Sequence, residues 1–137
     1  MIHRVLGIGR WMVDFLFATE EYDEEGVLSC LYDADAPLSI MRRSLLIMES
    51  GYYNRGFTYS NPEQKRAVVV VGPTTSGDEF INTLVHELQH LSVAIASELG
   101  YDIDGETPAY IIGDTAQELF EVICDYGCEE CRNQRFP

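Results

Sequence analysis

The chain has 137 residues, of which 46% are hydrophobic and 11% aromatic, and its formal net charge at pH 7 is −14. This length predicts a single domain over residues 1–137 that buries one core, and the composition excludes an intrinsically disordered chain. The strong negative charge excludes a protein that binds nucleic acid through its phosphates, because that affinity comes mainly from lysine and arginine.

The N-terminal stretch MIHRVLGIGRWMVDFLF contains Arg10 and Asp14 and ends without the small residues of a cleavage site. We therefore expect folded protein there rather than a signal peptide. No apolar run in the chain reaches the roughly 20 residues that a transmembrane helix needs. These features predict a cytoplasmic protein that does not act at a membrane.

Residues 10–20, RWMVDFLFATE, are rich in aromatic and β-branched side chains, a pattern typical of a strand. The acidic residues 20–26 follow as a loop, or as the solvated first turn of a short helix that continues through VLSCLYDA. Residues 36–50 predict a second helix, with Pro37 in its first turn and Gly51 at its end.

Two further strands are predicted in the middle of the chain. The first is the short GFTYS segment at residues 56–60, and the turn NPEQK follows it. The second is RAVVVVG at residues 66–72, whose run of valines ends at Gly72 and Pro73.

Residues 74–100 give the strongest helix pattern in the chain. Ser76 or Asp78 can cap its N-terminus, acidic residues occupy its first turn, and Gly100 closes it. A loop then leads to a last helix that we expect to run to residue 128.

This last helix begins at Thr107 and tolerates Pro108 only because proline fits a first turn. Gly113, in its middle, indicates either a kink or a close contact with another helix. The order strand, helices, strands, helix, helix predicts an α+β fold in which a small sheet packs against helices.

The stretch HELQH places His86 and His90 four residues apart within the strongest helix, with Glu87 between them. Residues i and i+4 project from the same face of a helix, so both imidazoles can reach one cation. Glu87 lies beside that face, where it can reach a water held by a metal ion. The alternative is that both histidines are exposed on a helix and bind no metal.

Between Ala67 and Cys131 the chain has many carboxylates and neither lysine nor arginine. A solvated acidic surface explains most of these residues. The same negative field also suits a bound cation, and both histidines lie within it.

A zinc ion would need a third protein ligand, which leaves its fourth position for water. Glu98 lies two helical turns beyond His90 on the same helix, too far along the axis to share an ion with it. On geometry we favour Glu106, at the start of the next helix, over Asp102 and Asp104 in the loop. Further downstream the acidic residues are Asp114, Glu118 and Glu121.

HELQH followed after a short loop by GETPAY resembles the gluzincin group of zinc metallopeptidases. The segments GFTYSN, AVVVVG and GETPAYIIGDTAQ extend this resemblance to small, uncharacterised metallopeptidase-like proteins of phages and mobile elements of gut bacteria. The resemblance implies a zincin-like fold and a Zn²⁺ ion bound by His86, His90 and Glu106. It also implies that Glu87 is the general base.

In such folds an edge strand above the metal helix pairs with an extended substrate, and residues 66–72 are the candidate for that strand. A buried central strand explains the same valine run equally well. Tyr110 shares a helical face with Glu106 and could stabilise an oxyanion as a catalytic residue, or could pack in the core. We assign no role to His3.

The cysteines of the tail, CDYGCEECR, recur with spacings of four and three, which would place Cys124, Cys128 and Cys131 on one face of a helix. They could form a thiolate metal site, completed by Cys30, or simply pack a last helix. Without paired CxxC motifs, packing is the simpler interpretation.

These observations predict a zinc-dependent metallopeptidase or related hydrolase that acts on a peptide or protein substrate. Glu87 would take the proton of the attacking water and pass it to the leaving amine. The alternative is an inactive, metal-stabilised acidic module that binds a host protein, because so short a chain has little material for a deep cleft.

Overall fold

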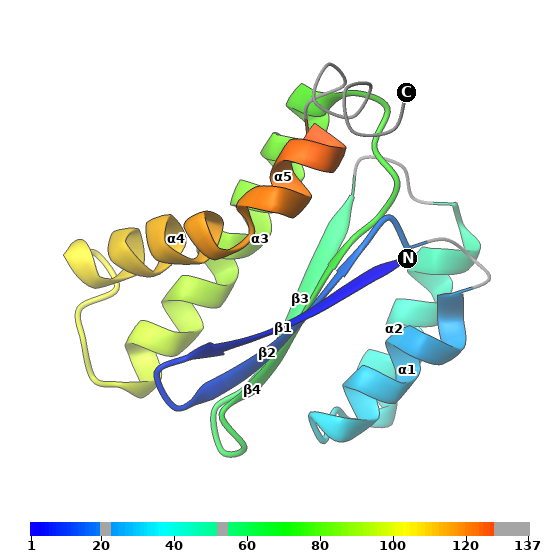
Figure 1. The fold of residues 1–137 in the computed structure, drawn as a ribbon. Coiled ribbons are helices and arrows are strands. Elements are labelled where there is room, and N and C mark those ends of the chain that lie inside the picture. The colour runs from blue at the N-terminus through cyan, green and yellow to red at the C-terminus, as the bar shows by residue number, and fades with distance from the viewer. Residues whose placement is uncertain (20–22, 52–54, 128–137) are drawn as a thin grey trace.

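The computed structural model of the chain describes residues 1–19, 23–51 and 55–127, and these form a sheet with helices on both faces (Figure 1). The strands are β1 (Ile2–Ile8), β2 (Trp11–Phe17), β3 (Gly56–Asn61) and β4 (Arg66–Val71). The helices are α1 (Glu24–Asp33), α2 (Leu38–Glu49), α3 (Gly77–Glu98), α4 (Glu106–Glu118) and α5 (Phe120–Gly127). The predicted α+β fold, with a small sheet packed on helices, is confirmed.

The strand order in the sheet is β1-β2-β4-β3. β1 and β2 form an antiparallel hairpin, in which Ile8 pairs with Trp11 and Gly9 takes the positive φ of +59° that the tight turn requires. β2 pairs with β4 in parallel, and β3 pairs with β4 antiparallel. β1 and β3 are therefore the two edges of the sheet.

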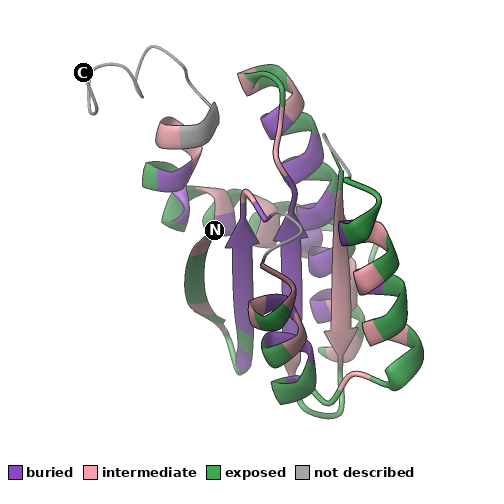
Figure 2. Cartoon of the chain, turned by 90° about the vertical axis from the view of Figure 1, so that its right-hand side faces the viewer, coloured by how far each residue is buried: buried purple, intermediate pink, exposed green. Residues whose placement is uncertain are grey.

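β4 is a central strand, buried on both faces (Figure 2). Val69 and Val71 belong to the apolar cluster beneath α3, whereas Val68 and Val70 belong to the cluster beneath α1 and α2. The valine run is thus explained by burial on two faces, and the interpretation of residues 66–72 as an edge strand is wrong. The strand at the sheet edge next to β4 is β3.

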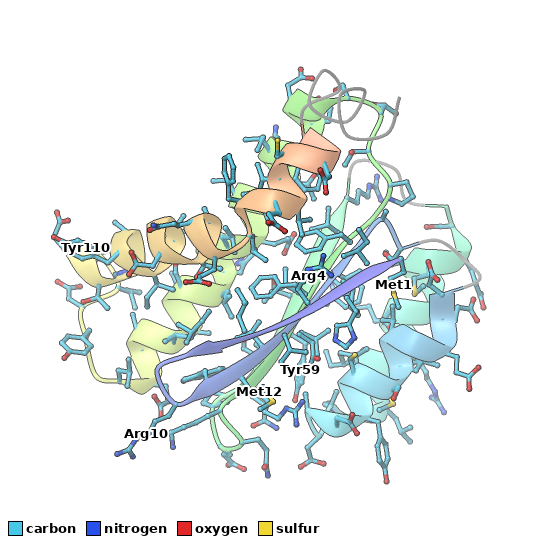
Figure 3. All side chains as sticks on the ribbon, in the orientation of Figure 1. Met1, Arg4, Arg10, Met12, Tyr59 and Tyr110 are labelled. Atoms are coloured by element: carbon cyan, nitrogen blue, oxygen red, sulfur yellow. The ribbon has the colours of Figure 1, made fainter. Side chains whose placement is uncertain are left out.

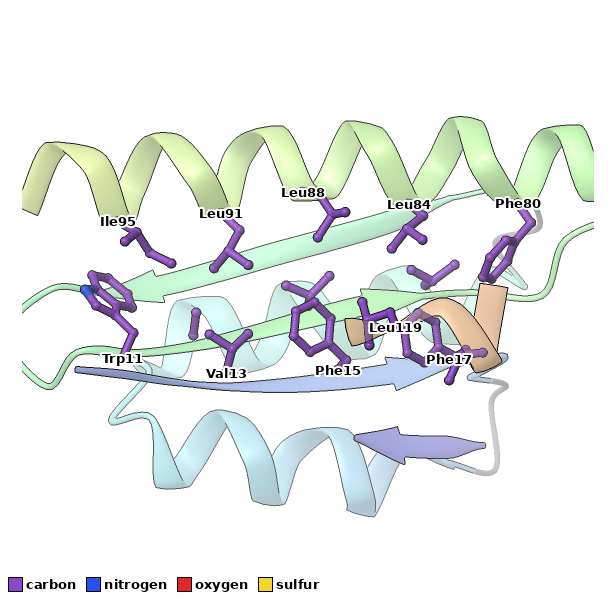
Figure 4. Close-up of a cluster of buried hydrophobic side chains, with 14 residues drawn as sticks. Trp11, Val13, Phe15, Phe17, Phe80, Leu84, Leu88, Leu91, Ile95 and Leu119 are labelled. Atoms are coloured by element: carbon purple, nitrogen blue, oxygen red, sulfur yellow. The ribbon is translucent and has the colours of Figure 1, made fainter. Parts of the chain in front are cut away.

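α3 packs on the sheet through one apolar side chain per turn (Figure 4). Ser76 caps it by accepting a hydrogen bond from the Glu79 N–H at 3.4 Å, and Gly100 follows its end with a φ of +80°. The stripe repeats with helical spacing and fixes the rotation of α3 about its own axis. It consists of Phe80, Leu84, Leu88, Leu91 and Ile95.

The C-terminal helical region is two helices rather than one, and the break falls at Leu119 instead of Gly113. Leu119 and Val122 are buried in the core beside α3, which a straight continuation of α4 would not allow. A Cβ at Gly113 would meet nothing within 4 Å, so no close contact requires glycine there. A bilayer-spanning helix is not found among the residues that the structure describes.

Replacing Leu88 with alanine tests this core directly. Leu88 is 1% exposed, so Leu88→Ala should lower the free energy of unfolding by about 2–5 kcal/mol. Val85→Ala is the control on the same helix, since Val85 is 47% exposed and its loss should change stability by less than about 0.5 kcal/mol. Urea unfolding followed by circular dichroism measures both, and equal losses would contradict the packing described.

Candidate functional site

His86 and His90 meet on the exposed flank of α3. Their Nε2 atoms are 3.2 Å apart, and the rings lie edge to face with centroids 4.9 Å apart. At that separation at most one of the two nitrogens carries a hydrogen, so the pair is either hydrogen-bonded or able to share a cation. The sequence prediction that both imidazoles lie on one face is confirmed.

The spacing of the two nitrogens fits two ligands of one zinc ion. Zinc–nitrogen bonds of about 2.0–2.1 Å at a tetrahedral angle place two nitrogens about 3.3–3.4 Å apart. The observed 3.2 Å is within a few tenths of an ångström of this value without any movement of α3.

Glu87 lies between the histidines in sequence, but it points inward and is 4% exposed. The Thr58 hydroxyl, on β3, donates a hydrogen bond to Glu87 Oε1 at 2.9 Å, and it also lies 3.3 Å from the Glu87 carbonyl oxygen. Gly56 permits this close approach, because a Cβ there would collide with the Val70 carbonyl oxygen and crowd the Glu87 and Thr83 side chains. β3 therefore holds the carboxylate of Glu87 in place.

A groove with a volume of about 580 Å³ runs along the outer edge of β3. One wall of the groove is formed by α2, including the exposed Arg43, and the other wall by α3 with its two histidines. Within the described part of the chain, no strand pairs with this edge of β3. The groove thus brings an open strand edge, an imidazole pair and a carboxylate together.

Glu106, predicted as the third zinc ligand, is not brought to the histidines. It is an exposed residue of the first turn of α4, and α4 packs against the other flank of α3 and beside β1. The histidine pair faces the β3 edge, at the opposite side of the sheet. The motif correctly predicted that Glu106 lies at the start of a helix. The direction of that helix, α4, depends on tertiary packing, which the motif does not encode.

Tyr110 also lies away from the groove. It is 66% exposed on α4 and points outward (Figure 3), so the expectation that it packs in the core is wrong. Because Tyr110 does not line the groove, the structure does not bring it to Glu87 either.

Two of the other acidic candidates, Asp102 and Glu98, have local structural roles. Asp102 accepts a hydrogen bond from the Asp104 N–H at 2.9 Å, which closes the loop before α4. Glu98 lies 3.4 Å from Lys65 Nζ and 3.5 Å from Trp11 Nε1, at the far end of α3. None of these three side chains lines the groove.

Cys30 and Cys124 are the two cysteines within the described part of the chain, and they lie on opposite faces of the sheet. Cys30, in α1, packs on one face of the sheet, whereas Cys124 belongs to α5 on the other, so Cys30 does not complete a site with Cys124. Cys128 and Cys131 lie outside the described residues. Burial, and then the charges of Asp14 and Asp33, raise the pKa of the Cys30 thiol to about 11, so it is protonated at neutral pH.

His3, to which the sequence assigned no role, lies beside Cys30. Its Nε2 atom is 2.7 Å from Asp14 Oδ1 and 3.9 Å from Cys30 Sγ. The register of the β1–β2 hairpin makes His3 and Asp14 diagonal neighbours. Recognising the cluster from sequence requires this hairpin, and the strand at residues 2–8 was not predicted.

Replacing Thr58 with valine should remove the donor to a buried carboxylate. We expect Thr58→Val to lower the free energy of unfolding by about 1–3 kcal/mol, because Glu87 Oε1 then loses a hydrogen bond that water replaces poorly. Thr58→Ser keeps the hydroxyl and should lose less. Thermal and urea unfolding of both variants provide the measurement, and a serine variant as unstable as the valine variant would argue against the hydrogen bond.

Comparison of this chain with family models, with curated proteins and with solved structures finds no match. The groove itself is therefore the basis for a proposed function. Its chemistry rests on His86, Glu87, His90 and Thr58, together with the open edge of β3.

Proposed function

We propose that this chain is a zinc-dependent hydrolase that cleaves an extended peptide held along the outer edge of β3. The observation that carries the proposal is the 3.2 Å separation of the His86 and His90 Nε2 atoms at the wall of the β3 groove. This separation supports a metal ion bound by the two imidazoles, beside a strand edge to which a peptide backbone would add. The zincin-like character of the fold is part of the proposal.

The peptide would add a strand to β3. An exposed strand edge offers alternating N–H and C=O groups, which bind an extended backbone with little dependence on its side chains. α2 and α3 form the two walls of the groove, so the groove admits only one added strand. Arg43 is the only lysine or arginine among the described residues that line the groove, and it favours an acidic side chain on the peptide.

Glu87 is the residue proposed to move protons. When bound, zinc supplies Lewis acidity, which polarises a carbonyl oxygen and makes a water molecule more acidic. Thr58 holds Oε1 of Glu87, and leaves Oε2 to accept the proton of the attacking water. Glu87 then donates that proton to the leaving amine.

A second candidate is a metal-dependent binding module without turnover, and one observation favours it. Catalytic zinc sites commonly have three protein ligands, yet the described residues that line the groove contain no carboxylate or imidazole beyond His86, Glu87 and His90. In that case the open edge of β3 would bind a partner's strand and release it unchanged. The two candidates differ in turnover and agree on metal and peptide binding.

Metal content tests the ligand set. Relative to wild type, His86→Ala/His90→Ala should lose about one equivalent of zinc per chain, because the pair supplies both nitrogens. Glu106→Ala should lose none, since Glu106 lies toward the opposite edge of the sheet. Mass spectrometry on untagged protein gives the values. Equal zinc in wild type and the double variant would reject the metal role of the pair.

Peptide cleavage distinguishes the two candidates. We expect wild type to cleave members of a random peptide library, and Glu87→Gln to keep zinc while its kcat/KM falls by at least about 100-fold. The matched control is Glu79→Gln, which removes a carboxylate from the first turn of the same helix, outside the groove. Zinc-loaded wild type that binds peptides without cleaving them would favour the binding module.

A further inference from the structure

A row of polar side chains crosses the face of the sheet that α1 covers. His3 of β1, Asp14 of β2 and Arg66 of β4 lie side by side, and Cys30 of α1 lies over them. Asp14 is 4% exposed and Cys30 8% exposed, within a layer that is mostly apolar. Buried polar groups of this kind require partners, and their positions show what they can bind.

The arrangement does not suit nucleophilic catalysis by Cys30. A cysteine–histidine–aspartate triad uses the two ring nitrogens of histidine separately, one toward the nucleophile and the other toward the carboxylate. Here the same atom, His3 Nε2, is nearest to both Asp14 Oδ1, at 2.7 Å, and Cys30 Sγ, at 3.9 Å. A sulfur, a nitrogen and an oxygen that converge on one point form a ligand set instead.

We propose that His3, Asp14 and Cys30 form a second divalent-metal site, which binds Zn²⁺ independently of the His86–His90 pair. Their three ligand atoms lie within 4.8 Å of one another, and no other group of three such side chains meets this condition among the described residues. Three protein ligands leave a fourth position on zinc for water, and a thiolate with an imidazole selects zinc over magnesium or calcium.

The distances require only a small adjustment. Tetrahedral zinc places a sulfur and a nitrogen ligand about 3.5–3.6 Å apart, close to the observed 3.9 Å. The nitrogen–oxygen distance of 2.7 Å must widen by about half an ångström. His3 can make this movement, because it lies on an edge strand and its side chain is 42% exposed. The same exposure gives the ion a route from solvent.

Arg66 orients the carboxylate without occupying the ligand oxygen. Its Nη2 atom lies 3.3 Å from Asp14 Oδ2, while Oδ1 faces His3. Such a partner, bound to the second oxygen, is common around metal-ligating carboxylates. The competing explanation is a His3–Asp14–Arg66 ion-pair network without metal, which gives Cys30 no part. Whether the Cys30 thiol binds a metal ion therefore distinguishes the two explanations.

A cobalt titration of the full chain tests the site. The starting variant carries His86→Ala and His90→Ala, and has Cys124, Cys128 and Cys131 changed to serine, so that Cys30 is its only thiol. We expect Co²⁺ to produce a thiolate-to-cobalt charge-transfer absorption that saturates at about one equivalent. Zinc should displace the cobalt, and at a concentration about 100-fold above its Kd should raise Tm by about 10 °C.

Two further substitutions in this starting variant locate the ligands. Cys30→Ser should abolish the absorption, and His3→Ala, at a partly exposed position that tolerates truncation, should weaken cobalt binding at least about tenfold. Asp33→Asn is the matched control, because Asp33 carries a charge near Cys30 but is not a ligand, and its variant should bind cobalt as before. Circular dichroism verifies that each variant is folded.

Absence of the charge-transfer absorption in the starting variant would overturn the proposal. The same absorption in the Cys30→Ser variant, or unchanged cobalt affinity in the His3→Ala variant, would overturn it as well. Because the starting variant lacks His86 and His90, these outcomes do not depend on the proposed hydrolase site.

Discussion

The rotation of α3 about its own axis determines what the rest of the structure can do. The apolar stripe from Phe80 to Ile95 sits on the central strands, and burial of one large side chain per turn leaves no freedom to turn the helix. Because that face of α3 packs on the sheet, His86 and His90 project from its flank toward β3. A helix rotated by a quarter turn would bury the imidazoles or direct them to α4.

β3 completes this arrangement from the other side. Gly56 lets the strand approach α3, and Thr58 of the same strand holds the carboxylate of Glu87. The short strand GFTYSN thus supplies both a binding edge and a hydrogen bond to the buried carboxylate. Because the edge lies in a recess between α2 and α3, it is open to a single added strand and shielded from a broad surface.

Local patterns predicted most of the fold. Periodicity or capping residues predicted four elements that the structure contains. These are the helices predicted at 36–50 and 74–100, the strand that includes Trp11–Phe17, and the valine strand. The β1 strand was missed although it forms a tight hairpin with β2, because IHRVLGI has no clean alternation of apolar and polar residues. The break at Leu119 was missed because it depends on packing against the core, which includes residues distant in sequence. A valine run also cannot say on its own whether it lies at an edge or in the centre of a sheet.

The candidate site could be predicted only in its local part. Helical geometry alone places His86 beside His90, since it requires nothing from the rest of the chain. The position of Glu106 depends on how α4 turns and packs, and its sequence distance from His90 does not contain that information. The cluster of His3, Asp14 and Cys30 unites three elements, so only the pairing of β1 with β2 and the docking of α1 reveal it.

Among the described residues no further strand pairs with the outer edges of β1 and β3, and this has a consequence for the behaviour of the protein in concentrated solution. Open edges invite sheet-to-sheet growth between copies, which natural proteins oppose with charge, twist or covering segments. With a formal net charge of −14 at pH 7, neighbouring molecules repel one another before their edges meet. That repulsion vanishes near the isoelectric point of about 4.3, so mild acid brings this fold closest to self-association.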